Sequence, residues 1–227
     1  MGPEFVADLA RHGEATALII DGRPPISYAE LARRAADFGK RLGAHKGLVA
    51  VEAAPCEHAV IGYLGTLAAG HSVALLPPDD LNALESFRTK FAPDAIYRRV
   101  DERWRLESSS ERTQSELHPE LALILLTSGS TGHGKAVRLS STAVGTNAHA
   151  ITDYIGLRSD DRAALVLPIH YSYGLSVLNS HLSVGASVYI TKRSVLDEGF
   201  VEALDKTGCT NLQGVPFTYD TDVAPAL

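Results

Sequence analysis

One stretch of the chain limits its fold and chemistry more than any other. An apolar run at residues 121–126 leads into a segment that is nearly all Gly, Ser or Thr, and Lys135 follows. Glycines let the backbone adopt positive φ and approach an anion closely, so that several N–H groups can converge on one phosphate. Hydroxyls and a lysine add donors and positive charge. The stretch therefore predicts a buried strand that ends in a phosphate-binding loop.

Two structures compete for this loop. Gly129, Gly134 and Lys135 fit the P-loop pattern G-x-x-x-x-G-K-[ST], but Ala stands where the pattern needs a magnesium-binding Ser or Thr. A P-loop also needs a helix that starts at the lysine. Residues 136–139 instead have the pattern of a second strand, and the helix signal begins only at residues 140–141. We therefore expect a hairpin around the loop, and a P-loop kinase or ATPase is the alternative.

The loop resembles the phosphate loop of the adenylate-forming superfamily, which includes acyl-CoA synthetases, the adenylation domains of peptide synthetases, and luciferases. The family sequence is roughly T-S-G-[ST]-[ST]-G-x-P-K-[GA]-V. Residues 127–137, TSGSTGHGKAV, match it except at Gly134, where the family usually has Pro. The resemblance implies that this loop binds the phosphates of ATP. The implied phosphate-binding residues are Thr127, Ser128, Gly129, Ser130, Thr131, Gly132 and Lys135.

Strand and helix signals alternate along the chain. Strands are expected at residues 17–20, 48–51, 71–76, 94–97, 121–126, 136–139, 163–167, 186–190 and 210–215. Helices are expected after Ser27 and at residues 57–69, 81–91, 141–155, 174–182 and 195–205. This alternation predicts an α/β fold with layered sheets of largely parallel strands flanked by helices. The resemblance implies the N-terminal portion of the large domain of an adenylate-forming enzyme.

A polar, Ser-rich segment at residues 107–115 is the expected connector between two parts of this fold. We expect an N-terminal α/β subdomain at residues 1–115. A second α/β subdomain, at residues 116–227, contains the phosphate loop and is expected to be incomplete at its C-terminus. Residues 26–31, ISYAEL, and residues 64–78, LGTLAAGHSVALLPP, resemble two further blocks of the same family, to which we assign structural roles only.

Composition excludes several other classes of protein. With 227 residues and 45% hydrophobic content, the chain can bury a core. Its net charge of −6, without a dense stripe of Lys or Arg, disfavours a nucleic-acid partner or an anionic membrane surface. Cys56 and Cys209 are far apart and in no metal-binding spacing, so buried free thiols are expected rather than a disulfide or a zinc site.

The sequence gives no sign of membrane insertion or secretion. Residues 1–11 lack the basic start and the long apolar run of a secretory signal. The most apolar stretch, residues 59–78, is interrupted by glycines and by His71 and divides into a helix and a strand. We expect a cytoplasmic protein.

A second informative segment is residues 168–175, PIHYSYGL, where a buried strand gives way to a helix. Ligands of α/β sheets bind at such strand ends. The segment resembles the family's P-x-F-H-x-x-G or P-x-x-H-x-Y-G block, with the histidine displaced by one position, and residues 211–216 resemble the family strand that ends in V-P. The resemblance implies that an acyl or thiol-acceptor pocket is formed by His170, Tyr171, Tyr173, Gly174 and Gly214. A core or helix-capping role is the alternative for His170, and a core position for the tyrosines.

The resemblance implies an ATP-dependent ligase that uses Mg²⁺. Such an enzyme converts a carboxylic acid into an acyl-adenylate, releases pyrophosphate, and passes the acyl group to coenzyme A or to a phosphopantetheinyl carrier protein. The family's Y-G-x-T-E block, its T-G-D block and its C-terminal domain with the catalytic Lys have no match in this sequence. We therefore assign no catalytic residue and no metal ligand, and we expect a shortened chain that binds ATP weakly and is inactive alone. A non-catalytic binding or scaffold module is a further alternative.

Overall fold

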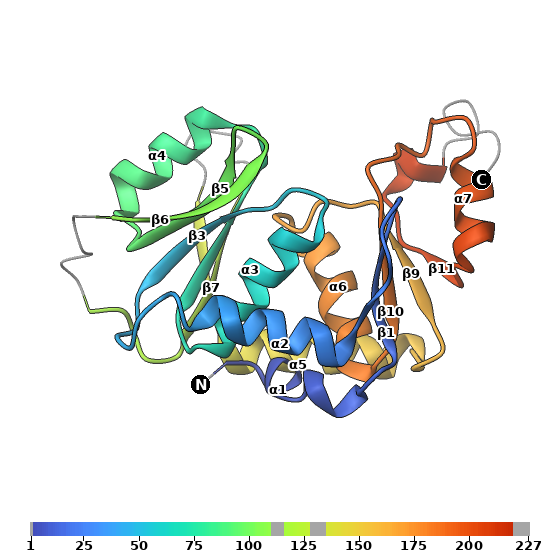
Figure 1. Cartoon of the computed structure of the whole chain (residues 1–227), viewed down its shortest axis with the longest axis horizontal. Coiled ribbons are helices and arrows are strands. Elements are labelled where there is room, and N and C mark those ends of the chain that lie inside the picture. Colours follow the sequence, from blue (N-terminus) through green and yellow to red (C-terminus); the bar gives the residue numbers. More distant parts are fainter. Residues whose placement is uncertain (1, 110–115, 128–134, 220–227) are drawn as a thin grey trace.

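The computed structural model describes residues 2–109, 116–127 and 135–219. Within these residues the strands form two sheets, which stand on either side of a layer of helices (Figure 1). Most strand pairs in both sheets are parallel. The expected α/β fold with layered, largely parallel sheets is therefore confirmed.

The larger sheet has the strand order β6-β5-β3-β4-β7-β8 in the described part of the chain. Its strands are β3 (Leu48–Glu52), β4 (Ser72–Leu76), β5 (Ala95–Val100), β6 (Arg103–Ser108), β7 (Leu121–Leu126) and β8 (Ala136–Ser140). The four inner strands run parallel, and β6 and β8 pair antiparallel at the two edges. β4 is buried along its whole length because helices cover both faces of this sheet.

The smaller sheet has the order β11-β9-β10-β1-β2 among the described residues. Its strands are β1 (Thr16–Ile20), β2 (Ile26–Ser27), β9 (Arg162–Leu165), β10 (Ser187–Ile190) and β11 (Asn211–Leu212). β1 pairs in parallel with β10, which lies far from it in sequence, and in the larger sheet β4 pairs with β7. Each sheet thus takes strands from both sides of residue 115, and the expected boundary there does not separate the two sheets.

The helices fill the space between the sheets and cover their outer faces. α2, α3, α5 and α6 lie between the sheets, α4 lies outside the larger sheet, and α7 lies outside the smaller one (Figure 1). The helices are α1 (Glu4–Ala7), α2 (Tyr28–Gly39), α3 (Glu57–Ala68), α4 (Leu81–Phe91), α5 (Ser141–Ile155), α6 (Ser172–Val184) and α7 (Phe200–Thr207). Short 3₁₀ helices span Leu9–His12 and Pro216–Tyr219.

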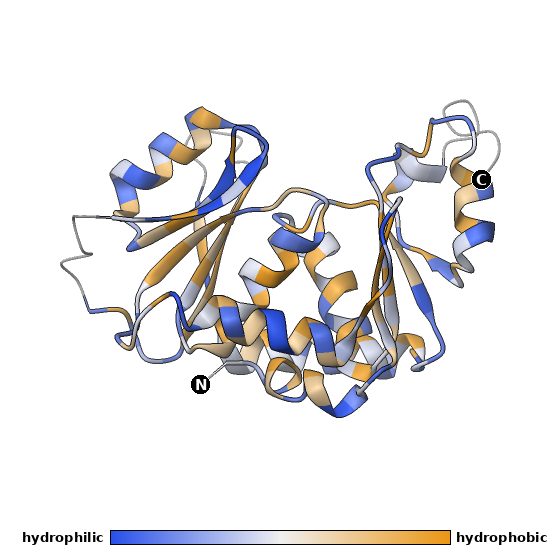
Figure 2. Ribbon diagram, in the orientation of Figure 1, coloured by the Kyte–Doolittle hydropathy of each residue, from blue (hydrophilic) through white to orange (hydrophobic). Residues whose placement is uncertain are grey.

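The main core lies in the helical middle layer and on the sheet faces that enclose it. Figure 2 shows hydrophobic residues concentrated on the helices and strands of this region. α3 is buried on nearly all sides, as a helix between two sheets must be. At its centre the Tyr63 hydroxyl donates to Asn179 Oδ1 of α6 at 3.2 Å, which pairs two buried polar groups. A second core joins α4, through Leu84 and Phe87, to the outer face of the larger sheet.

Two predicted elements near the end of the chain are wrong in extent. The helix predicted at 195–205 begins only at Phe200, because Gly199 has φ +80° and the Asp197 side chain accepts from the Ser194 N–H in a preceding turn. The strand predicted at 210–215 is reduced to β11. It forms only two register pairs with β9 before the chain turns into the 3₁₀ helix.

Candidate functional site

The phosphate-loop segment leaves and re-enters the larger sheet at a closed hairpin base. β7 and β8 pair antiparallel, from Leu121 opposite Ser140 to Leu126 opposite Ala136. Beyond the last pair, the Thr127 N–H donates to the Lys135 carbonyl oxygen at 2.9 Å. The Thr127 hydroxyl donates to the same carbonyl at 3.2 Å and accepts from the Lys135 N–H at 3.3 Å. The ends of the loop are therefore held together by three hydrogen bonds.

This geometry confirms the predicted hairpin. Lys135 is followed by a strand, and α5 begins at Ser141, where the Ser140 hydroxyl accepts from the Ala143 N–H at 3.1 Å. The P-loop alternative is wrong, because it requires a helix that starts at the lysine. Five of the implied phosphate-binding residues lie outside the described residues: Ser128, Gly129, Ser130, Thr131 and Gly132.

The hairpin base lies where ligands of parallel sheets bind. β7 runs parallel to β4, which runs parallel to β3, so Thr127 is at the same edge of the sheet as the carboxyl ends of those strands. This edge is the usual ligand-binding edge of open α/β sheets. Thr127 and Lys135 are both exposed there. Within the described part of the chain, no ion pair involves Lys135.

The predicted polar aromatic cluster lies on the loop between β9 and α6 and on the first turn of α6. The His170 and Tyr171 rings approach to 4.2 Å between centroids. His170 is half-buried, and its Nδ1 has no hydrogen-bond partner among the described residues. Burial lowers the pKa of His170, which favours the neutral imidazole at pH 7. Tyr171 and Tyr173 are 51% and 46% exposed, so the core alternative for the two tyrosines is wrong.

The two predicted glycines of this pocket permit close packing. A Cβ on Gly174 would lie 2.4 Å from the Leu167 carbonyl oxygen and 2.5 Å from that of Pro168. Gly174 thereby brings the start of α6 against the end of the β9 loop. A Cβ on Gly214 would lie 2.5 Å from the Thr218 side chain, so this glycine allows the turn into the final 3₁₀ helix. Neither glycine lines the cavity described next.

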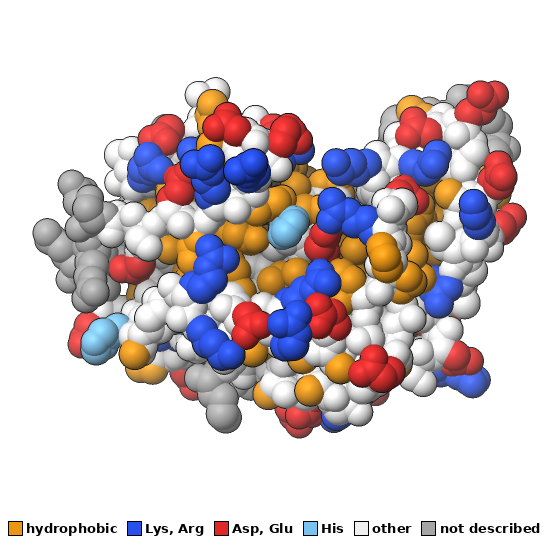
Figure 3. Space-filling model, in the orientation of Figure 1, with side chains coloured by type: hydrophobic (Ala, Val, Ile, Leu, Met, Phe, Trp, Pro, Cys, Tyr) orange, Lys and Arg blue, Asp and Glu red, His pale blue; other side chains and the backbone are white. Residues whose placement is uncertain are grey.

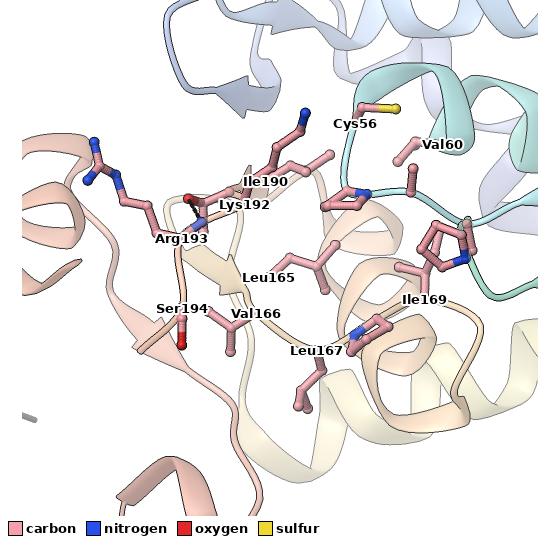
Figure 4. A pocket seen from close by; sticks show the side chains of 16 residues that line it. Cys56, Val60, Leu165, Val166, Leu167, Ile169, Ile190, Lys192, Arg193 and Ser194 are labelled. Carbon is pink, nitrogen blue, oxygen red and sulfur yellow. Dashed lines mark hydrogen bonds between the residues drawn. The ribbon is translucent and has the colours of Figure 1, made fainter. Parts of the chain in front are cut away.

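A cavity of about 210 Å³ lies where the carboxyl edges of the two sheets face each other. The larger sheet contributes residues 53–56 and Pro78, and the smaller sheet contributes residues 165–169 and 190–194. Figure 3 shows a hollow on this face of the molecule with hydrophobic side chains inside it and with Lys, Arg, Asp, Glu and His side chains around it. Figure 4 shows the lining at close range. The cavity reaches Ile169 but includes neither His170 nor the hairpin base.

Sequence reasoning missed the polar residues around this cavity. Asp21, at the end of β1, accepts from the Tyr189 hydroxyl at 2.6 Å and from the Thr191 hydroxyl at 2.9 Å. Lys192 and Arg193 follow β10 after one intervening residue, Thr191, and Cys56 directly precedes α3. The sequence contained a signal for these residues, because each of them follows a strand that was predicted to be parallel. Ligands of α/β sheets bind beyond the carboxyl ends of such strands. Cys56 and Cys209 are free and half-buried rather than fully buried.

The described residues form neither a metal-binding cluster nor a membrane-spanning helix. No group of three or more His, Cys, Asp or Glu side chains there is arranged to hold a metal ion. In the same residues, no helix has the length and apolar character needed to cross a membrane.

Comparisons with known proteins agree with the observed fold and with the family resemblance of residues 127–137. The isonitrile lipopeptide synthase of Streptomyces coeruleorubidus is 27% identical, over 98% of this chain and 17% of that protein. The crystal structure of apo MatB from Rhodopseudomonas palustris matches with a TM-score of 0.77 at 24% identity, over 96% of this chain and 50% of that one. ATP-bound MatB from the same organism matches with a TM-score of 0.75 at 25% identity, over 94% of this chain and 50% of that one.

The chain therefore spans half the length of these MatB structures and about a sixth of the lipopeptide synthase. Residues 87–226 match the family described as AMP-binding enzyme, and this region includes both the hairpin and the His170 loop. The resemblance drawn from residues 127–137 is confirmed. Because the match extends over more than half of the 227 residues, this chain belongs to the AMP-binding enzyme family.

Proposed function

We propose that this chain carries the phosphate-binding part of an ATP-dependent carboxylic acid ligase. In this reaction a carboxylate oxygen attacks the α-phosphorus of ATP, so that an acyl-adenylate forms and pyrophosphate leaves. The sulfur of a thiol, in coenzyme A or in the phosphopantetheine arm of a carrier protein, then attacks the acyl carbonyl, and AMP leaves. The observation that carries the proposal is the hairpin that Thr127 and Lys135 close at the carboxyl edge of the larger sheet.

The role of the hairpin in this reaction is to position charge. Lys135 follows the loop directly, and its ammonium group would contact the β- and γ-phosphates that depart as pyrophosphate. The Thr127 hydroxyl would join it by exchanging its hydrogen bond to the Lys135 carbonyl for one to a phosphate oxygen. Donors held in place before the reaction stabilise the charge that develops on a leaving phosphate. The similarity to ATP-bound MatB supports ATP as the ligand. Mg²⁺ is part of the proposal, since metal ions bridge and neutralise the phosphate oxygens in such transfers.

We assign the acyl group or the incoming thiol to the loop after β9. The exposed rings of Tyr171 and Tyr173 and the Nδ1 of His170, which has no hydrogen-bond partner among the described residues, support this assignment. Gly174 and Gly214 would support the same pocket by close packing. A cytoplasmic location is part of the proposal, as are the carboxylic acid substrate and the thiol partner.

Thermal unfolding with and without ATP tests the proposal. A ligand at about ten times its Kd stabilises the folded state by about 1.4 kcal/mol, so millimolar ATP should raise the Tm. Lys135→Ala removes a charged donor and should weaken ATP binding by about tenfold. Arg138→Ala, on the exposed side of the same hairpin, removes an equal charge and should leave ATP binding unchanged.

Two outcomes separate the alternatives. If ATP does not raise the Tm even at millimolar concentration, the non-catalytic binding module is the correct interpretation. Pyrophosphate release with a panel of carboxylic acids should be undetectable for the 227-residue chain, because the family's adenine, ribose and catalytic-lysine blocks have no match in it. Robust release would contradict that part of the proposal.

A further inference from the structure

His181 is completely buried near the end of α6, and it links this helix to β11. Its Nδ1 lies 2.8 Å from the Val177 carbonyl oxygen, one turn earlier in the helix, and its Nε2 lies 3.2 Å from Oδ1 of Asn211. Both oxygen atoms are acceptors, whereas a neutral imidazole has a single N–H donor. The two contacts can therefore both be hydrogen bonds only when the ring carries two protons.

A neutral ring requires the Asn211 side chain to turn. The Val177 oxygen belongs to the helix backbone and can only accept, so the single proton stays on Nδ1 and Nε2 needs a donor. A half-turn of the Asn211 amide puts Nδ2 in the place of Oδ1 without a change of shape. The Thr210 hydroxyl now accepts from Asn211 Nδ2 at 3.2 Å and donates to Asp161. After the half-turn it can donate to Asn211 Oδ1 instead.

The half-turn of Asn211 extends to Gln213. Gln213 Nε2 donates to Asn211 Oδ1 at 2.8 Å, while Gln213 Oε1 is buried and has no hydrogen-bond partner among the described residues. When Asn211 turns, its Nδ2 faces Gln213 Nε2, and two donors cannot form a hydrogen bond. Gln213 must then turn as well, so that Oε1 accepts from Asn211 and Nε2 takes the buried position. The buried end of Gln213 is therefore an acceptor when His181 is charged and a donor when His181 is neutral.

The charges around His181 set the direction of this change. The titratable and charged side chains on the surrounding elements are those of Asp161 before β9, Arg162 on β9, Arg11 and His12 on the first 3₁₀ helix, Asp153 on α5, and Lys206 and Cys209 around the end of α7. α6 and β10 have no Asp, Glu, Lys or Arg. Burial lowers the pKa of His181, and the hydrogen bonds to Val177 and Asn211 and the charge of Asp161 raise it by less. The neutral ring is therefore the form at pH 7, and the ring takes up a proton as the pH falls.

We propose that His181, Asn211 and Gln213 form a relay that couples the uptake of a proton in the core to the end of β11. Protonation of the ring turns both amides, and an oxygen replaces the nitrogen at the buried end of Gln213. β11 pairs with β9 at two residues, and Gln213 comes directly before the tight turn at Gly214. The relay therefore acts where the smaller sheet ends. Because none of its residues belongs to the phosphate loop, the inference goes beyond the proposed function.

Nitrogen-15 NMR of the 227-residue chain follows these side chains during a pH titration. His181→Gln identifies the ring signals of His181 by their loss, and Gln213→Leu identifies its amide, since the sequence has two glutamines. We expect neutral His181 to carry its proton on Nδ1. The Gln213 amide should shift with the same midpoint as the ring. The amide of Asn82, which is exposed on α4, is the control and should show no such midpoint.

Asn211→Asp replaces an amide that can turn by a carboxylate that only accepts. An opposite charge beside the ring should raise the midpoint of His181 by about 1–3 pH units. Gln213 Nε2 should then donate to the carboxylate at every pH, so that the Gln213 amide loses its pH response. Asn82→Asp makes the same chemical change on the surface of α4 and should leave both midpoints as they are in the unmodified chain.

Three results would overturn the relay. The first is a His181 ring that stays neutral until the chain unfolds, and the second is a neutral ring with its proton on Nε2. The third is a Gln213 amide that follows a different midpoint, or that still responds in the Asn211→Asp variant. The first two are measured on the unmodified chain, so they do not depend on the folding of any variant. Because no ATP is added and Lys135 is unchanged, these results are separate from the test of the proposed function.

Discussion

At the scale of single residues, glycines decide how closely the elements of this fold approach each other. Gly65 of α3 faces the Ala35 carbonyl oxygen of α2, and an added Cβ there would lie 2.5 Å from it. Gly174 approaches two carbonyl oxygens as closely, since an added Cβ would lie 2.4 and 2.5 Å from them. Gly145 of α5 is different, because an added Cβ would meet its nearest atoms only at 3.9 Å. The same residue type thus has a packing role at two positions and none at the third.

Gly174→Ala should destabilise the protein by about 1–3 kcal/mol, since backbone atoms must move to admit the methyl group. The matched control is Gly145→Ala, which lies inside a helix where the added methyl would make only ordinary van der Waals contact, 3.9 Å from Pro3. There the added methyl should stabilise the protein by up to about 1 kcal/mol through helix propensity. Urea unfolding of both variants checks this pair. Equal effects of the two substitutions would contradict the close approach at Gly174.

At the scale of elements, the junction between β8 and α5 decides which nucleotide-binding class the chain resembles. The strand continues through Ser140, whose hydroxyl caps the helix that starts at Ser141. A P-loop would need a helix from Lys135 instead. Capping patterns could be predicted from sequence here, at Ser27 as well as at Ser140, because a cap depends on a few neighbouring residues.

Ser140→Ala should cost about 1 kcal/mol of stability, because the Ala143 N–H loses its acceptor at the helix start. Ser140→Asn should retain most of the stability, since Asn is also a good N-cap residue. Thr142→Ala, two positions later and exposed, provides the control and should change stability little. Urea unfolding measures all three variants. A cost at Ser140 no larger than that at Thr142 would argue against a helix start at this residue.

At the scale of the whole molecule, strands from distant parts of the chain complete each sheet. β10 needs β1 as its neighbour, and β7 needs β4. Buried parallel strands without their partners would leave N–H and C=O groups unsatisfied, which is costly. The strand pairing therefore does not favour residue 115 as a boundary between two folding units, and the expected boundary stays a proposal.

Separate expression of residues 1–115 and 116–227 tests this boundary. We expect neither part to show a single cooperative unfolding transition, because each would expose strand edges that the whole chain pairs. Co-expression should allow the two parts to associate, and circular dichroism with co-purification checks both expectations. Cooperative unfolding of residues 116–227 alone, at the stability of the whole chain, would establish the boundary.

The sequence by itself determined most elements, the hairpin around the loop and the family, because local periodicity, caps and a short loop pattern depend on near neighbours. α4 was predicted at its observed bounds. Residues 195–199 were misread as helix because the Asp197 side chain and Gly199 form a turn there. Only the tertiary structure decided the pairing of β1 with β10, and it alone brought Cys56, Leu165 and Lys192 around one cavity. The physical reason is that these contacts join segments far apart in sequence, where no local preference determines which strand becomes the neighbour.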